Sequence, residues 1–360
     1  MNRKLRAGFI GCGGIAVLKH MPSVARFDDV EMVAFCDIIE ERMKKAANDF
    51  GTINAKTYSN YHELIADKTI DIVYVLTPNI SHCAITVAAL EAGKHVMCEK
   101  PMATTYADAK KMLDAAERTG CKLTVGYQSR WRQDSQYLKK VCENGELGEI
   151  YYARAHAIRR RAVPTWGVFL DEENQGGGPL IDIGTHALDL TLWLIDNYEP
   201  KMVVGTVYKK LGKNSDCGNM FGPWNPKEFT VEDSAFGFIT MKNGATIYLE
   251  AAWALNTLDI EEAKTSLSGT RAGADMKEGL RINGDKHGKL YIYKPELGSD
   301  GIAFFDGETM IPEVLEARNF IDAVKYDKEL CTKPEQAMVV TQILEAIYDS
   351  AKSSKPVFFE

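Results

Sequence analysis

The stretch Leu5-Arg-Ala-Gly-Phe-Ile-Gly-Cys-Gly-Gly-Ile-Ala16 is the part of the sequence that decides the fold. A short apolar run leads into Gly11-Cys12-Gly13-Gly14-Ile15-Ala16, which fits the pattern G-x-G-x-x-G/A between a strand and a helix. In such a junction Gly11 makes the tight turn, Gly13 lets the backbone approach a pyrophosphate, and Ala16 packs the helix on the strand. The free N–H groups at the start of the helix then face the anion.

An acidic residue after a second strand strengthens this interpretation. Val30–Cys36 is an apolar run typical of a strand, and Asp37 stands at its end. A carboxylate there accepts hydrogen bonds from the adenosine ribose and repels a 2′-phosphate, and the next residue is Ile38 rather than arginine or lysine. The alternative is an ordinary strand-to-helix turn with a surface aspartate. We expect NAD rather than NADP, bound by Gly11, Gly13, Gly14, Ile15 and Asp37.

Composition narrows the class of protein. A chain of 360 residues is too long for one typical core and suits two domains. The formal net charge of −7 argues against a nucleic acid or an anionic membrane as partner, because both bind basic surfaces. No apolar run has the length of a membrane span. We expect no signal peptide, because the first strand begins within a few residues of Met1.

The eight cysteines indicate a reducing compartment. They are scattered along the chain without a C-x-x-C pair, and several stand inside apolar runs. We therefore expect buried, reduced thiols, no structural zinc or other bound metal, and a cytoplasmic protein.

Strand and helix patterns alternate through the first 126 residues, which predicts a doubly wound parallel sheet. The apolar runs 69–76, 94–101 and 122–126 predict strands of this sheet. Ligands on such a sheet bind beyond the carboxyl ends of the strands. The residues at those ends should therefore line one rim: the Gly11 loop, Asp37, Thr77-Pro78-Asn79, Glu99-Lys100 and Tyr127-Gln128.

The pattern changes after residue 127. Strand-like runs follow one another, and Lys242-Asn243-Gly244 between two of them is a strong hairpin signal. Helical patterns recur at 180–195, 312–326 and 334–350. We expect a dinucleotide-binding domain at 1–127 and an α+β domain at 128–360 with a large, mostly antiparallel open sheet. Residues 209–229, rich in Lys, Asn, Gly and Pro, predict a loop insertion.

The predicted helix at 180–195 is apolar nearly all round, so we expect it to be buried. Asp182, His186 and Asp189 are spaced i, i+4 and i+7 and form one polar stripe on it. A carboxylate four residues away can fix the tautomer of the imidazole and raise its basicity. The preceding run Gly176-Gly177-Gly178 could bring a ligand close. In the alternative, Asp182 caps the helix and His186 is a hydrogen-bonded core residue; we expect Asp189 to be structural.

Three further residues are candidates for the site. Lys100 ends a buried strand between Glu99 and Pro101, where its ammonium either pairs with Glu99 or points into the cleft. A lysine in such a cleft suits proton transfer or alkoxide stabilisation, and the alternative is a surface lysine at a strand end. Arg159 could bind a polyhydroxylated substrate or lie in a solvated turn. Trp166 could stack on a sugar ring or pack in the core.

The sequence resembles the glucose–fructose oxidoreductase, inositol dehydrogenase and rhizopine catabolism (Gfo/Idh/MocA) family over essentially its whole length. The matching residues occur in the order seen in the family: Gly11–Ala16, Thr77-Pro78-Asn79 with His82, Glu99-Lys100-Pro101, and Asp182 with His186. The resemblance implies an N-terminal Rossmann domain and a C-terminal α/β domain whose open sheet builds homodimers or homotetramers.

The resemblance also implies the roles of particular residues. It makes Lys100, Asp182 and His186 the catalytic triad of an NAD(P)-dependent dehydrogenase. Gln128 stands where many members carry asparagine in a Gly-Tyr-Asn sequence. The implied cofactor contacts, beyond the glycine loop and Asp37, are Thr77, Pro78, Asn79, His82, Glu99, Lys100 and Gln128.

Family substrates are mostly sugars, cyclitols and their derivatives, and the segment 160–169 looks most like members that act on inositols or pyranosides. The resulting hypothesis is an NAD-dependent dehydrogenase that oxidises a secondary hydroxyl to a ketone in a cleft between the domains. His186 would take the hydroxyl proton, Asp182 would orient the imidazole, and Lys100 would stabilise the developing alkoxide. Arg159 and Trp166 would add substrate contacts.

Two alternatives use the same fold. One is a glycosidase that keeps NAD bound and cleaves by transient oxidation and elimination, which aglycone release without net nicotinamide reduction would reveal. The other is a non-catalytic sensor of dinucleotide and sugar. An intact set of Lys100, Asp182 and His186 argues against the sensor.

Overall fold

The computed structural model describes residues 3–214, 216, 218–297 and 311–360. The chain divides into two compact units, Met1–Gln128 with Met310–Met338, and Ser129–Thr309 with Val339–Glu360. The sequence pattern predicts that all residues after 127 belong to the second domain, whereas residues 310–338 return to the first unit. In the described part of the chain, no helix combines the length and apolar character needed to cross a membrane.

The first unit contains a six-stranded sheet of order β3-β2-β1-β4-β5-β6 in which every pairing is parallel. This confirms the doubly wound parallel sheet predicted from the sequence. The strand order reverses between β1 and β4, and this switch point is where such sheets bind ligands. The strands are β1 (Leu5–Ile10), β2 (Val30–Cys36), β3 (Lys56–Tyr58), β4 (Ile72–Val75), β5 (His95–Cys98) and β6 (Leu123–Val125).

The helices of the first unit follow local signals in the sequence. Helix α5 begins where Thr105 Oγ1 accepts a hydrogen bond from Asp108 N–H at 3.2 Å, and it ends at Gly120 with φ 67°. The helix after the glycine loop starts with a π-helical turn, η1, rather than a regular α-helix. The elements are η1 (Ala16–His20), α1 (Met21–Val24), α2 (Glu40–Phe50), α3 (Tyr61–Ala66), η2 (Asn79–Ser81), α4 (His82–Glu91), α5 (Tyr106–Thr119) and α9 (Pro312–Tyr326).

Helix α9 belongs to the first unit because its apolar side completes that unit's core. Phe320 is buried there, and its ring meets Tyr74 of β4 edge-on with 5.8 Å between centroids. Arg318 binds the carboxylate of Asp29 at 2.9 and 3.2 Å, and Lys325 binds it at 2.8 Å. The hydrogen bonds from Arg318, helped by Lys325, lower the pKa of Asp29 to about 2. Sequence patterns could not predict this anchor, because Asp29 and Arg318 are 289 residues apart.

The second unit contains a nine-stranded sheet of order β14-β13-β12-β11-β7-β10-β9-β8-β15. Among the described strands, β7 and β10 pair in parallel and the other neighbours pair antiparallel, which confirms the mostly antiparallel sheet. The predicted turn at 242–244 joins β9 to β10, with Gly244 at φ 92°. The strands are β7 (Ile150–Ile158), β8 (Pro200–Tyr208), β9 (Ser234–Met241), β10 (Thr246–Ala252), β11 (Glu261–Gly269), β12 (Ala272–Asp275), β13 (Arg281–Lys286), β14 (Lys289–Tyr293) and β15 (Val357–Phe358).

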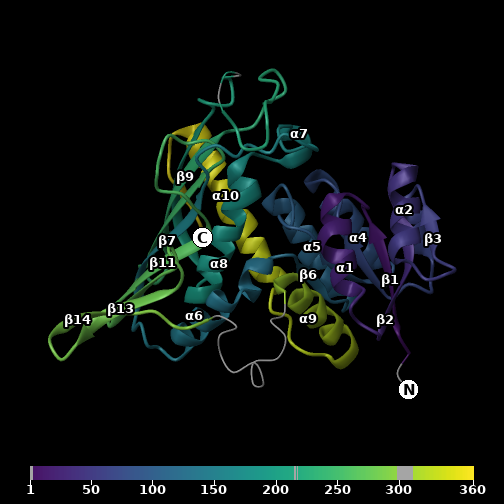
Figure 1. Cartoon of the computed structure of the whole chain (residues 1–360), viewed down its shortest axis with the longest axis horizontal. Helices are drawn as coiled ribbons and strands as arrows, with labels where there is room; N and C mark the ends of the chain where they lie inside the picture. Colours follow the sequence, from purple (N-terminus) through teal and green to yellow (C-terminus); the bar gives the residue numbers. More distant parts are fainter. Residues whose placement is uncertain (1–2, 215, 217, 298–310) are drawn as a thin grey trace. The chain divides into compact units, whose positions relative to one another are not determined.

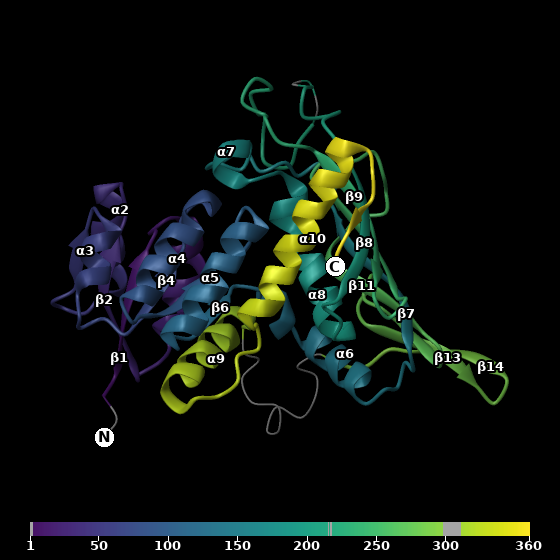
Figure 2. The ribbon, with the colours of Figure 1, turned by 180° about the vertical axis from the view of Figure 1, so that it is seen from behind.

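Among the described residues, helices cover one face of this sheet and none covers the other, which we call the open face. Helix α8 lies along β7 and β11, and α10 lies along β8 and β9 (Figures 1 and 2). The register pairs Phe238 with both Val204 and Tyr248, so these three side chains point to the open face. The helical elements are η3 (Gln128–Trp131), α6 (Gln133–Glu143), α7 (Glu172–Gln175), η4 (Leu180–Gly184), α8 (Thr185–Ile195) and α10 (Pro334–Ser353).

Two sequence expectations fall partly outside the described residues. The predicted insertion at 209–229 contains no helix or strand among its described residues, and residues 215 and 217 lie outside them. All cysteines that the structure describes are free thiols, and Cys217 is not among them. Burial raises the pKa of Cys12 and of Cys142 to about 12, so these thiols stay protonated near neutral pH.

Candidate active site

The loop after β1 has the shape that a pyrophosphate needs. Gly11 has φ 94°, and a Cβ added to it would lie 2.5 Å from the carbonyl oxygen of Leu76, so only glycine fits. A Cβ added to Gly13 or Gly14 would meet no atom within 4 Å, which leaves open space beside the backbone. Ala16 is fully buried and Ile15 partly buried. The loop therefore fits the phosphates of a dinucleotide, in agreement with the glycine pattern.

Asp37 is bound to the same loop. Its Oδ2 atom accepts a hydrogen bond from Cys12 N–H at 2.8 Å, and its Oδ1 atom accepts one from Ile39 N–H at 2.8 Å. Each carboxylate oxygen has a further lone pair that a ribose hydroxyl can use. The neighbouring Ile38 is 92% exposed, so an apolar side chain stands where a cation would be needed to bind a 2′-phosphate.

Glu99 and Lys100 stand just beyond the end of β5. Glu99 Oε2 accepts a hydrogen bond from Lys100 N–H at 2.9 Å, and Glu99 Oε1 lies 2.7 Å from His20 Nε2. His20 is the last residue of η1, so this buried contact joins the helix after the glycine loop to the segment that carries Lys100. His20 is not among the site residues that the sequence predicts. Its only signal was a histidine four residues after the glycine motif.

His82 lies inside the protein rather than at the rim. It is completely buried, with Nδ1 2.8 Å from the carbonyl oxygen of Pro101 and Nε2 2.9 Å from that of Thr77. Burial lowers the pKa of this imidazole. His82 therefore joins the two loops that follow β4 and β5, and we revise its expected cofactor contact to a positioning role.

The remaining rim residues differ in exposure. Thr77 and Pro78 reach the surface, whereas Asn79 is buried. With the Gln128 amide oriented to satisfy both of its polar atoms, its nitrogen donates to the carbonyl oxygen of Gly126 at 3.0 Å. Its oxygen then accepts a hydrogen bond from Lys19 Nζ at 3.3 Å. Gln128 is therefore also tied to the helix after the glycine loop.

Asp182 and Arg159 are brought together in the second unit. Asp182 Oδ2 accepts a hydrogen bond from Trp253 Nε1 at 2.9 Å and lies 4.0 Å from Arg159 Nη1. Arg159 also binds Glu262 through two hydrogen bonds of 2.6 Å. Asp182 is only 8% exposed, whereas His186 on the same helical segment is partly exposed. Trp253, which follows β10, is not among the site residues that the sequence predicts.

The segment that carries Asp182 differs from the prediction in its first turn. Leu180–Gly184 forms a π-helical turn, η4, and the regular helix α8 begins at Thr185. Such turns are rare in proteins overall, and those that occur often lie at functional sites. Asp189 is fully buried and binds Arg130 through hydrogen bonds of 2.6 and 2.9 Å. This ion pair supports the structural role expected for Asp189.

A buried carboxylate holds the start of the same segment. Glu232 Oε2 accepts a hydrogen bond from Gly178 N–H at 2.9 Å, while Oε1 accepts bonds from Leu180 N–H at 3.1 Å and the Tyr348 hydroxyl at 2.9 Å. Burial raises the pKa of Glu232, against the effect of these donors. The first N–H groups of a helix have no hydrogen-bond partner within the helix, and a nearby negative charge is stabilised there. Glu232 therefore caps the start of the segment that carries Asp182. No local pattern in the sequence predicts this role for Glu232, because it is 54 residues from Gly178.

The glycines before η4 serve this contact rather than a ligand. A Cβ added to Gly178 would collide with the carbonyl oxygen of Glu232, and one added to Gly177 would collide with the hydroxyl of Tyr348. The expectation that the glycine run brings a ligand close is therefore wrong at these two positions. Protein atoms occupy that space.

Trp166 lies at the surface rather than in the core. Its side chain is 52% exposed, and its ring makes edge contacts with Phe169 and Phe221. Of the two interpretations that the sequence left open, this position favours a platform that a ligand can reach.

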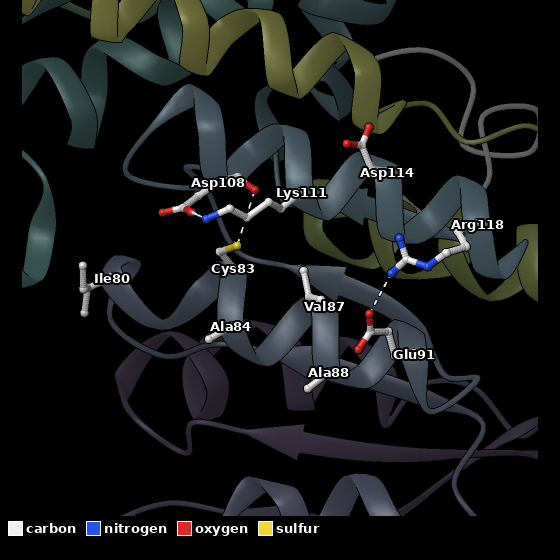
Figure 3. Close-up of a pocket in the computed structure, with 10 residues that line it drawn as sticks. All are labelled: Ile80, Cys83, Ala84, Val87, Ala88, Glu91, Asp108, Lys111, Asp114 and Arg118. Atoms are coloured by element: carbon white, nitrogen blue, oxygen red, sulfur yellow. Dashed lines mark hydrogen bonds and ion pairs between the residues drawn. The ribbon is translucent and has the colours of Figure 1, made fainter.

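A surface hollow of about 650 Å³ lies between α4 and α5 (Figure 3). Ala84, Val87 and Ala88 line it from α4, and a 2.7 Å ion pair between Glu91 and Arg118 spans it. None of the site residues predicted from the sequence lines this hollow. It is therefore separate from the candidate site.

Both halves of the chain match models of known protein families. A model described as an oxidoreductase family with an NAD-binding Rossmann fold matches residues 5–127. A second model, described as the C-terminal alpha/beta domain of an oxidoreductase family, matches residues 139–359. Together they match more than half of the chain.

Named relatives are sugar and cyclitol dehydrogenases. The chain is 36% identical over 354 residues to a D-glucoside 3-dehydrogenase of Escherichia coli (strain K12), covering 98% of this chain and 97% of that protein. It is 31% identical over 194 residues to an inositol 2-dehydrogenase of Salmonella agona (strain SL483), covering 53% of this chain and 55% of that protein. A solved levoglucosan dehydrogenase, in complex with NADH and levoglucosan, has a TM-score of 0.83 at 23% identity and 99% coverage of both chains. That likeness shows the shared fold.

The cap on η4 can be tested by unfolding. Glu232→Ala should lower the free energy of unfolding by at least about 3 kcal/mol, because two buried N–H groups and a hydroxyl lose their acceptor. Tyr348→Phe should cost about 1 kcal/mol, since both backbone hydrogen bonds remain. Urea denaturation followed by circular dichroism measures both changes.

Glu228→Ala is the matched control, because Glu228 is exposed in the same segment of chain. It should leave the unfolding midpoint unchanged. Equal midpoints for Glu232→Ala and Glu228→Ala would contradict the capping role.

Proposed function

We propose that this chain, which is an oxidoreductase of the Gfo/Idh/MocA family, oxidises a secondary hydroxyl of a sugar, glycoside or cyclitol to a ketone with NAD. The observation that carries the proposal is the match to D-glucoside 3-dehydrogenase, which spans 98% of this chain at 36% identity. Inositol 2-dehydrogenases match about half of the chain and extend the substrate class to cyclitols.

The first unit supplies the groups for the dinucleotide. The backbone at Gly13 and Gly14 borders open space suited to phosphates, and Asp37 has lone pairs for ribose hydroxyls. A 2′-phosphate would meet the carboxylate of Asp37 and the apolar side chain of Ile38, which favours NAD over NADP. NAD, when bound there, would supply the hydride acceptor for oxidation of the substrate carbon.

His186 is the proposed general base and takes the proton of the reacting hydroxyl. Asp182, fixed by Trp253 and faced by Arg159, orients the imidazole and stabilises its protonated form. Lys100 donates a hydrogen bond to the substrate oxygen and stabilises the developing alkoxide. Arg159, which lies 4.0 Å from Asp182, adds contacts to the substrate hydroxyls.

The two halves of the chain divide these roles. We assign dinucleotide binding to residues 1–127 and substrate binding with self-association to residues 128–360, apart from the segment that returns to the first unit. The free thiols of the described cysteines fit the reducing cytoplasm that the sequence analysis predicts.

The open face of the nine-stranded sheet supports self-association into a homodimer or homotetramer. Val204 and Phe238, paired across β8 and β9, are 38% and 45% exposed on it, and exposed apolar surface of this kind marks protein interfaces. Phe238→Asp should therefore shift the sedimentation coefficient toward that of the monomer. A wild-type protein that sediments as a monomer at micromolar concentration would contradict this assembly.

Asp37→Ala tests the cofactor preference. Removing the carboxylate should lower the ratio of kcat/KM for NAD to kcat/KM for NADP about tenfold or more, because the repulsion of the 2′-phosphate is lost. Asp28→Ala, an exposed aspartate before β2, should leave the ratio unchanged. If Asp37→Ala still excludes NADP, another residue determines the cofactor preference.

His186→Ala tests the proposed base. It should lower kcat by about 10²–10⁴-fold, the usual contribution of a general base, while the Kd for NAD changes little. Stopped-flow reduction of NAD and calorimetric NAD binding measure the two quantities. His62→Ala, an exposed histidine of α3, is the control, and unaltered kcat in His186→Ala would rule out the role.

A further inference from the structure

Aromatic rings connect the protein surface to the residue that binds Asp182. Trp253 donates its indole N–H to Asp182, and the Phe169 ring meets the Trp253 ring at 6.4 Å and 76°. Trp166 packs edge-on against Phe169 at 5.8 Å, and Phe221 packs edge-on against Trp166 at 4.9 Å. In the outer pair, Trp166 is therefore two ring contacts, and Phe221 three, from Trp253, the residue that binds Asp182.

The insertion at 209–229 holds Phe221 in this place. The side-chain amide of Asn219 donates to the carbonyl oxygens of Val163 and Gly222 at 3.0 and 2.8 Å, and its oxygen accepts from Val163 N–H at 2.8 Å. The hydroxyl of Thr165 donates to the carbonyl oxygen of Phe221 at 2.7 Å. These hydrogen bonds fix residues 219–222, which we call the tip of the insertion, and three of the four run to the segment that carries Trp166.

This well-fixed aromatic pair remains open to solvent. Trp166 is 52% exposed and Phe221 is 40% exposed, whereas Trp253 at the inner end is fully buried. Apolar rings with a few placed polar groups are the usual lining of small-molecule sites. Ring edges and faces of this kind pack against the C–H surface of a sugar ring or against an aryl group.

We propose that Trp166 and Phe221 form a second subsite, which binds the ring attached to the reacting sugar in a glycoside substrate. This inference rests on the proposed function. The reacting sugar takes its place at Asp182 and His186, and an aryl aglycone or a second sugar ring packs against the outer aromatic pair. The preferred substrates are then glycosides with a ring-shaped aglycone rather than free monosaccharides.

The test compares phenyl and methyl D-glucoside, both anomers of each, as substrates with NAD. Trp166→Ala and Phe221→Ala should lower kcat/KM for phenyl glucoside by about 2- to 12-fold, the value of one aromatic contact, and leave that for methyl glucoside nearly unchanged. Asn219→Ala should reproduce the effect of Phe221→Ala, because it releases the tip of the insertion. Met220→Ala is the matched control, since Met220 is 76% exposed beside Phe221 and belongs to no ring contact.

Calorimetric binding of both glucosides in the presence of NADH separates this inference from the proposed function. If Trp166→Ala loses binding of phenyl glucoside but keeps binding of methyl glucoside, the subsite is supported, whether or not a glucoside reduces NAD. If no glucoside reduces NAD, the proposed function is overturned and the subsite is not. Equal losses for phenyl and methyl glucoside, or no loss for either, would overturn the subsite even if both are oxidised.

Discussion

The placement of Asp182 and His186 depends on a carboxylate buried at the start of their helical segment. Glu232 binds two backbone N–H groups there, at Gly178 and Leu180. A charge so far from water is costly unless hydrogen bonds compensate it, so the surrounding chain must fit closely around it. Glycines precede the segment for this reason, and α10 contributes the Tyr348 hydroxyl. The start of the segment is thereby fixed from two other parts of the chain.

In the first unit, too, side chains hold loops in place by binding their main-chain atoms. Asp37 binds the backbone N–H of the glycine loop, and His82 contacts the backbone of the loops after β4 and β5. Glu99 contacts His20 and the backbone of Lys100. Residues on different strands are thus held to one another through main-chain atoms. A rim built in this way keeps its geometry before a ligand arrives, which lowers the entropic cost of binding.

Local patterns predicted the sheets, and topology predicted much of the rim. The run at 69–76 and the turn at 242–244 are local signals, and parallel strands necessarily bring their carboxyl ends together. His20, Glu232 and Trp253 act through partners 52 to 116 residues away, which no local pattern records. The π-helical turns at Ala16–His20 and Leu180–Gly184 also escaped prediction, because apolar spacing fits either helix type. The apolar side of α9 was visible in the sequence, but not the core that it completes.

The most direct test of the account is nicotinamide reduction by the purified protein supplied with NAD and a panel of D-glucosides, free sugars and inositols. The account predicts that at least one of these compounds yields NADH together with an equal amount of the corresponding ketone, as measured by absorbance and mass spectrometry. Tight NAD binding without reduction by any of them, accompanied by aglycone release from a chromogenic glucoside, would contradict a dehydrogenase and indicate cleavage by transient oxidation.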